Sequence, residues 1–233
     1  KFVLELIALH PRREDAQLAA VLAATKSDLR EMLTRLLADS GEQKAALVSS
    51  AIWWVIGNGD RELYDWLFAE FEGDPNQLPV KGSSLLMAAA RTGRIDLAED
   101  LLERGADLES LHKGGRHVAE NALGTTIHFG QFEMFRFLLE KGADPIGGTE
   151  GAYTLLMRAI DQQEPAMVPL LLEAGADPNR ADKEGCTALH VAARGSRPDL
   201  ESAKLLIEAG ADPNLANKKG FQPITRLPEE WFE

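Results

Sequence analysis

Thr187-Ala188-Leu189-His190-Val191-Ala192-Ala193 and, further along the chain, Leu206-Ile207-Glu208-Ala209-Gly210-Ala211-Asp212-Pro213-Asn214 are the two stretches that decide the fold. Thr187 can cap a short helix, and the two ring nitrogens of His190 can join neighbouring backbone segments. Small side chains at the end of this first stretch let the helix approach its neighbours closely. Apolar residues at helical spacing over 199–209 predict a second helix, which Gly210 ends in a left-handed conformation.

Both stretches recur along the chain. The glycines of the second, Gly105, Gly142, Gly175 and Gly210, stand 37, 33 and 35 residues apart in the numbering. Counting back one repeat at a time from Thr187 leads to Thr154, Asn121, Ser84, Ser50 and, more faintly, Leu18. Such a fixed period indicates a stack of repeats, each of which contacts only its neighbours. Together, the two stretches resemble the ankyrin repeat.

The resemblance implies an all-α fold, an ankyrin-repeat solenoid of helix-turn-helix repeats joined by short β-hairpins or loops. We expect a helical N-terminal cap or a degenerate repeat over 1–45, five ankyrin-like repeats over 46–216, and a partial C-terminal repeat or cap over 217–233. Asp182-Lys183-Glu184-Gly185 is predicted to form a hairpin tip, where Gly185 takes a conformation that a side chain would resist.

Composition limits the class of protein. The chain has 233 residues, a formal net charge of -12 and 45% hydrophobic residues, with no apolar run long enough for a membrane span. Its single cysteine, Cys186, excludes an internal disulfide and a zinc site built on several thiolates. We therefore expect a protein of a reducing, cytoplasmic setting, although the chain opens at Lys1 without a methionine and export stays open. Its richness in Ala, Leu, Arg and Gly suggests a bacterial source.

No pattern of catalytic residues is evident, so we predict that the chain is not an enzyme and needs no cofactor. The aspartates of the repeated Gly-Ala-Asp phrase are evenly spaced and do not converge on one substrate, which indicates turn residues. Cys186 and His190 could form a nucleophilic pair, but the histidine is needed by the repeat framework and no third group orients it. The glycine pairs match no phosphate-binding loop.

One repeat has a longer connecting loop, which contains His112 and His117, and a third histidine, His128, follows in the same repeat. A metal site there would need further ligands and lacks the helical geometry of zinc motifs, so no metal is predicted. Contact with a partner is the favoured role of this loop, and a solvated loop without a role is the alternative. An enzyme with its site in this loop is a third reading, which predicts bound metal or turnover.

Charge is expected to differ between the two sides of the repeats. Acidic residues fall on the predicted outer helices and turns, whereas the hairpin tips carry Lys and Arg. The acidic bulk of the molecule and the lack of an aromatic stacking platform argue against nucleic acid as a partner.

By resemblance to the family, partners bind the concave side, made of hairpin tips and the exposed ends of inner helices. Aromatic and basic side chains on such a surface are the usual anchors of an interface. Projecting the repeat register there also places Asp161 and Gln162 on this side. The predicted partner-binding residues are Lys81, Arg91, His112, Lys113, Arg116, His117, His128, Phe129, Tyr153, Lys183, Arg194, Lys218 and Phe221.

Aromatic residues leave two interpretations open. Phe129, Tyr153 and Phe221 either contact the partner or pack between adjacent hairpins. Trp53 and Trp54 are expected to pack near the N-terminal end, with Trp54 the more exposed of the two.

The sequence thus predicts a monomeric, cytoplasmic protein-protein interaction module without membrane or nucleic-acid partners. One specific role would be a bacterial inhibitor, of the immunity type, of a toxin or effector. The alternative is a regulatory or targeting ankyrin module of a longer chain, whose catalytic or anchoring part lies outside this sequence.

Overall fold

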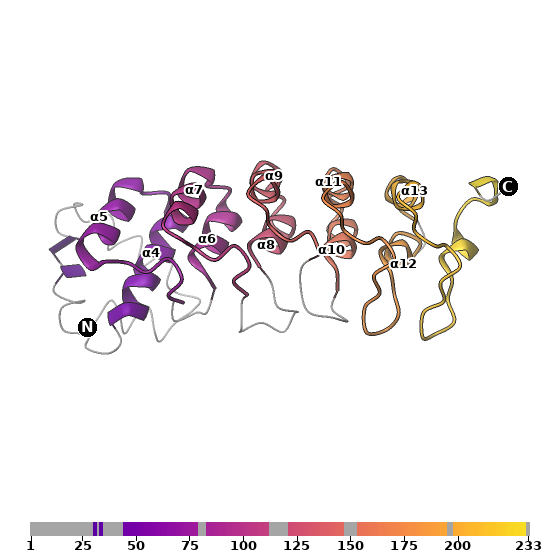
Figure 1. Ribbon diagram of the computed structural model, residues 1–233, viewed down its shortest axis with the longest axis horizontal. Helices are drawn as coiled ribbons and strands as arrows, with labels where there is room; N and C mark the ends of the chain where they lie inside the picture. The colour runs from indigo at the N-terminus through magenta and orange to yellow at the C-terminus, as the bar shows by residue number, and fades with distance from the viewer. Residues whose placement is uncertain are drawn as a thin grey trace.

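The computed structural model describes residues 30–31, 33–34, 44–78, 83–111, 121–146, 153–194 and 198–231. Within these ranges the chain is helical, without β-strands, and forms an elongated stack of helix pairs (Figure 1). The pairs are α4 (Lys44–Asn58) with α5 (Arg61–Phe71), α6 (Leu85–Thr92) with α7 (Ile95–Glu103), α8 (Ala122–His128) with α9 (Phe132–Glu140), α10 (Leu155–Asp161) with α11 (Met167–Glu173), and α12 (Ala188–Ala192) with α13 (Leu200–Glu208). Two 3-10 helices follow, η2 (Pro223–Arg226) and η3 (Glu229–Trp231). This confirms the predicted all-α solenoid.

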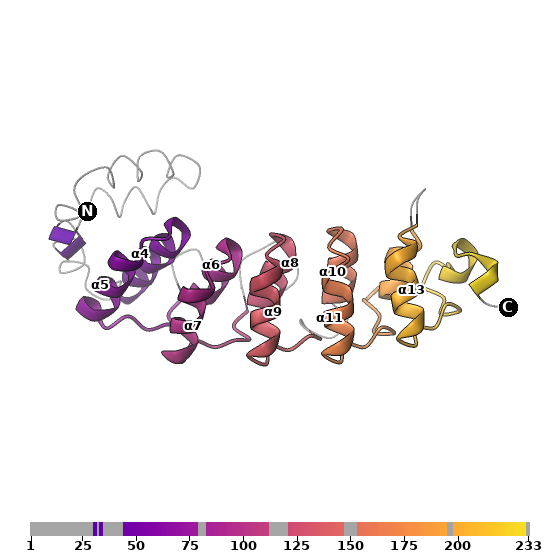
Figure 2. The same cartoon turned by 90° about the horizontal axis from the view of Figure 1, so that it is seen from above.

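Helices of the same kind stack on one another and form two layers. The inner layer contains α4, α6, α8, α10 and α12, and each of these helices contacts the next one. The outer layer contains α5, α7, α9, α11 and α13, which lie side by side when the molecule is seen from above (Figure 2). The loop between α11 and α12 and the loop that follows α13 extend beyond the inner layer, on the side opposite the outer layer (Figure 1). The proposed division at 45 and 216 stays a prediction, and most of 1–45 lies outside the described residues.

Polar side chains fix the starts of the inner helices. Ser84, Asn121 and Thr154 each accept a hydrogen bond from the backbone N–H three residues on, at 2.9–3.2 Å. Thr187 begins α12 with a capping box, as its position predicted. Ser50 does not begin a helix: it lies inside α4, where its hydroxyl donates to the carbonyl of Ala46 at 2.7 Å. The run from Lys44 onward lacks Gly and Pro before Gly57, so nothing stops the helix from starting earlier.

The core runs between the two layers. Inner helices contribute small side chains, such as Ala192 and Ala193, which are 1% and 0% exposed and confirm the expected close packing. Outer helices contribute larger ones, among them Leu101 and Phe135, both fully buried. Helix α13 is one residue shorter at each end than predicted, with Asp199 and Ala209 as its caps, and Gly210 follows with φ of 90°. The expected hairpin tip is a turn, in which Gly185 has φ of 77°.

His190 joins two repeats through both ring nitrogens, as predicted. The backbone N–H of Thr187 donates to its Nδ1 at 3.1 Å, and its Nε2 lies 3.2 Å from the carbonyl oxygen of Phe221 in the next loop. The ring also meets the Phe221 ring edge to face, with centroids 5.8 Å apart. Burial lowers the pKa of His190, against the opposing effects of the Phe221 carbonyl and Asp182.

The lowered pKa predicts that acid weakens the C-terminal repeats. Above about pH 6.5 His190 is neutral in both states, and below it the unfolded chain takes up a proton that the folded ring resists. The free energy of unfolding should therefore fall by at most about 1.4 kcal/mol per pH unit from this group. Hydrogen exchange of the α12 amides at pH 7.5 and 5.5 measures this on the native protein.

A substitution tests whether the effect belongs to His190. His190→Gln should remove part of the pH dependence, because the titrating ring is gone. Equal pH dependence in wild type and His190→Gln would contradict the assignment.

Short turns after the outer helices also have a repeated structure. The carboxylates of the repeated Gly-Ala-Asp phrase each accept from the backbone N–H two residues on, at 2.8–3.0 Å, namely in Asp107, Asp144, Asp177 and Asp212. Their role as turn residues is thereby confirmed.

Side chains beside these turns tie one repeat to the next. Asn179 donates from Nδ2 to the carbonyl of Gly210 at 2.9 Å and accepts at Oδ1 from the N–H of Asp212 at 2.8 Å. Asn76 makes the same two bonds with the turn that follows it. In the repeat that follows Asn76, Glu109 accepts from the N–H of Asp144 at 2.8 Å. These bonds hold successive turns in register.

Ile146 occupies the same position in the next repeat and cannot make such bonds. Its side chain is 38% exposed, so little burial is lost when it is replaced. Ile146→Asn should gain hydrogen bonds to the Asp177 turn and raise the free energy of unfolding by about 0.5 to 1.5 kcal/mol. Urea denaturation measures this change, and Asn179→Ala, which removes an existing tie, should act in the opposite direction. Unchanged stability in Ile146→Asn would show that the turn cannot use the amide.

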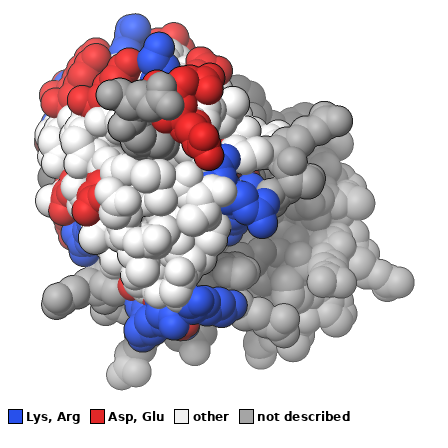
Figure 3. Space-filling model, turned by 90° about the vertical axis from the view of Figure 1, so that its right-hand side faces the viewer, with Lys and Arg blue, Asp and Glu red and all other residues white. Residues whose placement is uncertain are grey.

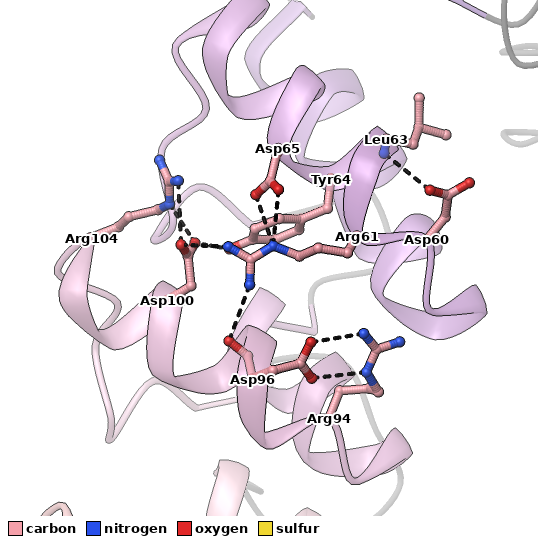
Figure 4. A network of polar contacts seen from close by, with 9 residues as sticks. All are labelled: Asp60, Arg61, Leu63, Tyr64, Asp65, Arg94, Asp96, Asp100 and Arg104. Atoms are coloured by element: carbon pink, nitrogen blue, oxygen red, sulfur yellow. Dashed lines mark hydrogen bonds and ion pairs between the residues drawn. The ribbon is translucent and has the colours of Figure 1, made fainter.

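A polar network joins α5 to α7 on the outer side (Figure 4). Asp100 accepts from the hydroxyl of Tyr64 at 2.6 Å, from Arg61 at 3.1 Å and from Arg104 at 2.5 Å. Burial opposes ionisation of Asp100, but the hydrogen bonds from Arg104 and Tyr64 outweigh it and lower its pKa. Burial and the bond to Asp100 raise the pKa of Tyr64 far above its ordinary value. Asp100 is the shared acceptor of the other three side chains, so the network ties α5 to α7 and has a structural role.

Residues 217–231 cover the C-terminal end of the stack. The backbone N–H of Asn217 donates to the carbonyl of Phe221, and that of Lys218 donates to Glu184 in the preceding loop, both at 3.0 Å. Short 3-10 helices then replace the inner helix, and Leu227 is buried against the last repeat.

Candidate protein-binding face

Charge differs sharply between the two helix layers. The outer-layer helices contain 12 acidic and 3 basic residues, whereas the inner-layer helices contain 1 acidic and 3 basic residues. Seen from the C-terminal end, acidic side chains gather over the outer helices and basic ones below, where the loops lie (Figure 3). The segregation predicted from the sequence is therefore present in the described part of the chain. We call one surface the inner face. It consists of the ends of the inner helices, with Arg91, His128, Phe129, Asp161 and Arg194, and of the described loop tips, with Lys183 and Lys218.

Arg91, at the end of α6, lies on the N-terminal part of the inner face. Its guanidinium stacks over the ring of Trp53 at 4.5 Å from the centroid, a cation–π contact between two repeats. Gln131 of the following repeat donates to the Arg91 carbonyl at 3.3 Å. Trp53 and Trp54 are both half-buried, so the expected greater exposure of Trp54 is not apparent.

His128 and Phe129 lie at the end of α8, in the turn to α9. Their rings meet edge to face with centroids 4.8 Å apart, and both side chains are exposed. The Phe129 side chain is 48% exposed, which is unusual for a large aromatic residue. The repeat framework does not require an aromatic residue at this position. Of the three aromatic candidates it is the one most open to a partner.

Tyr153 and Phe221 are less accessible. Both are half-buried and pack against the core, in agreement with the alternative of packing between adjacent loops. Burial raises the pKa of Tyr153, whose hydroxyl lies near Arg194 and Asp161. Alanine at either aromatic position would therefore remove packing as well as any contact with a partner.

Arg194 forms an ion pair with Asp161, which joins the ends of α12 and α10. The side chains are 54% and 40% exposed, so the pair lies in water and contributes little to stability. The repeat register predicts both residues on this face, whereas their pairing was not expected.

Two of the predicted loop-tip cations lie where expected. Lys183 and Lys218 are exposed in adjacent loops, which the Lys218–Glu184 backbone hydrogen bond joins. Five other predicted contact residues lie outside the described residues and stay predictions: Lys81, His112, Lys113, Arg116 and His117.

Other kinds of site find no support in the described ranges. No group of three or more His, Cys, Asp or Glu is placed there to hold a metal ion. The half-buried Cys186 accepts a hydrogen bond from Asn217, while Nδ1 of His190 bonds to Thr187, so these two residues form no nucleophilic pair. Among the described helices, none has the length and apolar character needed to cross a bilayer.

Stacked helix pairs with linked turns and an open, charged inner face define a helical repeat protein. Comparison with models of protein families identifies the kind of repeat. An ankyrin repeat model matches residues 81–113, and a model of three ankyrin repeats matches residues 108–182 and 128–217. These matches together cover more than half of the chain, which belongs to the ankyrin repeat family. Ankyrin repeats are non-catalytic modules that bind other proteins.

Two curated relatives are about a third identical to this chain over the regions that match. A putative ankyrin repeat-containing protein of Treponema pallidum is 32% identical over 122 residues, which are 52% of this chain and 40% of the relative. Palmitoyltransferase Hip14 of Drosophila melanogaster is 32% identical over 112 residues, 46% of this chain and 16% of the relative. The matched regions thus span less than half the length of these relatives.

Proposed function

We propose that this chain binds a protein partner through the inner face. The observation that carries the proposal is Phe129, an aromatic side chain 48% exposed at the end of an inner helix, where folding does not require it. Basic side chains flank it on the same layer, and aromatic and arginine residues are the common anchors of interfaces. An open array of repeats suits an extended protein surface better than an enclosed small molecule.

The test compares two exposed apolar residues on opposite layers. Phe129→Ala removes the proposed anchor, and Leu200→Ala, 43% exposed on the outer helix α13, is the matched control. A partner identified by affinity purification from the native host should bind the Phe129→Ala variant at least about tenfold more weakly. Binding to the control should be unchanged. Equal affinity of both variants for the partner would refute an interface at the inner face.

A second candidate is a regulatory or targeting module within a longer polypeptide. It is favoured by the relatives, in which the matched region is a minor part of the protein, as in the palmitoyltransferase. Sequencing the complete reading frame distinguishes the two candidates. Inhibition of a toxin or effector enzyme, a monomeric state and a cytoplasmic location stay predictions, and identification of the partner tests the first of them.

A further inference from the structure

Basic side chains lie on the inner face although the chain as a whole has a net charge of -12. Arg91 and Arg194 lie at the ends of α6 and α12, and Asp161 lies at the end of α10 between them. Lys183, Lys218 and Lys219 add exposed cations in the loops that precede α12 and η2. Glu184 is exposed beside them, and the carboxylate of Asp182 is occupied by the backbone N–H groups of Glu184 and Cys186.

Two arginines on this face are held in different ways. Arg91 lies over the Trp53 ring and pairs with no carboxylate among the described residues. Arg194 is paired with Asp161, and both side chains are largely open to water. Because a solvent-exposed ion pair is weak, an incoming carboxylate can replace Asp161 as the partner of Arg194 at little cost.

We propose that the inner face recognises a short acidic segment of the partner, with Arg194 passing from Asp161 to a carboxylate of that segment. This inference rests on the proposed function and adds the chemistry of the partner. Arg91, fixed on Trp53, supplies a second anchoring charge. Phe129 lies on the same layer and contacts apolar side chains of the segment.

Charge geometry favours a short peptide over a nucleic acid. At physiological ionic strength, electrostatic interactions extend only about 8 Å, and the acidic outer helices lie one helix layer, about 8 to 10 Å, behind the inner layer. A short segment on the inner face therefore experiences mainly the local cations. A long polyanion carries charge beyond this face and is repelled by the acidic bulk of the protein.

The test uses the two members of the ion pair. The probe is a short fluorescein-labelled peptide rich in Glu with one aromatic residue, compared with the same peptide carrying Gln for Glu, by fluorescence anisotropy. Arg194→Gln should weaken binding of the Glu peptide about threefold or more, because it removes an anchoring charge. Asp161→Asn should tighten binding by a similar factor, because it removes a competing carboxylate while keeping a similar shape. Lys204→Gln, on the outer helix α13, should change nothing.

A purely structural ion pair would behave differently, since both substitutions would then change binding in the same direction or not at all, and either result overturns the proposal. Equal binding of the Glu and Gln peptides also overturns it. Tighter binding of a single-stranded oligonucleotide than of the Glu peptide would replace it by nucleic-acid binding.

If the identified partner still depends on Phe129 while the protein binds the Glu and Gln peptides equally, the acidic-segment inference fails and the proposed function stands. If the partner binds independently of Phe129, the proposed function itself fails.

Discussion

Phe135→Ala is expected to destabilise the protein by about 3 to 5 kcal/mol, the range for removal of a buried aromatic ring from a packed core. The Phe135 side chain is fully buried on α9, between the two layers. Because a repeat contacts only its neighbours, the loss should be greatest at α8 and α9 and decline along the stack. Hydrogen exchange resolved by helix measures both the size and the spread of the effect.

Phe129 supplies the matched control within the same repeat. Phe129→Ala removes a largely exposed ring and should change the free energy of unfolding by less than about 0.5 kcal/mol. Thus the two substitutions separate stability from binding: Phe135 should affect the first and Phe129 the second. Equal destabilisation by both would mean that Phe129 belongs to the core and would remove it as a binding anchor.

Asp100→Ala should cost about 2 to 3 kcal/mol, because it leaves the buried Tyr64 hydroxyl and the Arg104 guanidinium without their acceptor and removes one of the acceptors of Arg61. Asp65→Ala is the control: among the described residues Asp65 bonds to Arg61 only, and its side chain is 48% exposed, so its loss should cost less than about 1 kcal/mol. Urea denaturation at pH 7 measures both values.

The pH dependence tests the same network. Since the pKa of Asp100 is lowered in the folded protein, its stabilising effect is complete above the ordinary value of 3.8 and is lost as the pH falls through the lowered pKa. The difference in stability between wild type and Asp100→Ala should therefore be constant near neutral pH and shrink in strong acid. A difference independent of pH would show that the carboxylate does not act through its charge.

Features that depend on nearby residues could be predicted from the sequence. The cap at Thr187, the end of α13 at Gly210 and the aspartate turns each involve residues a few positions apart, so their spacing was sufficient. His190 could also be placed, because its bridge to the next loop recurs with the repeat. The prediction that Ser50 begins a helix was wrong, because the repeat pattern is weak near the N-terminal end. There α4 is 15 residues long and begins at Lys44, before Ser50.

Contacts between side chains of neighbouring repeats were not predictable in the same way. The stacking of Arg91 on Trp53 and the pairing of Arg194 with Asp161 depend on how one repeat sits against the next and on the chosen rotamers. Likewise, the sequence left open whether Phe129, Tyr153 and Phe221 face a partner or the core, and burial separates the first from the other two.

Photo-crosslinking from defined positions tests most directly whether the inner face binds the partner. A photoreactive residue replaces His128 or Arg194 on the inner face, or, as controls, the exposed Arg136 or Lys204 on outer helices α9 and α13. Binding at the inner face predicts crosslinks to the partner from the first two positions and none from the controls. Crosslinks from Arg136 and Lys204 alone would place the interface on the acidic outer layer and contradict both the proposed face and the proposed chemistry.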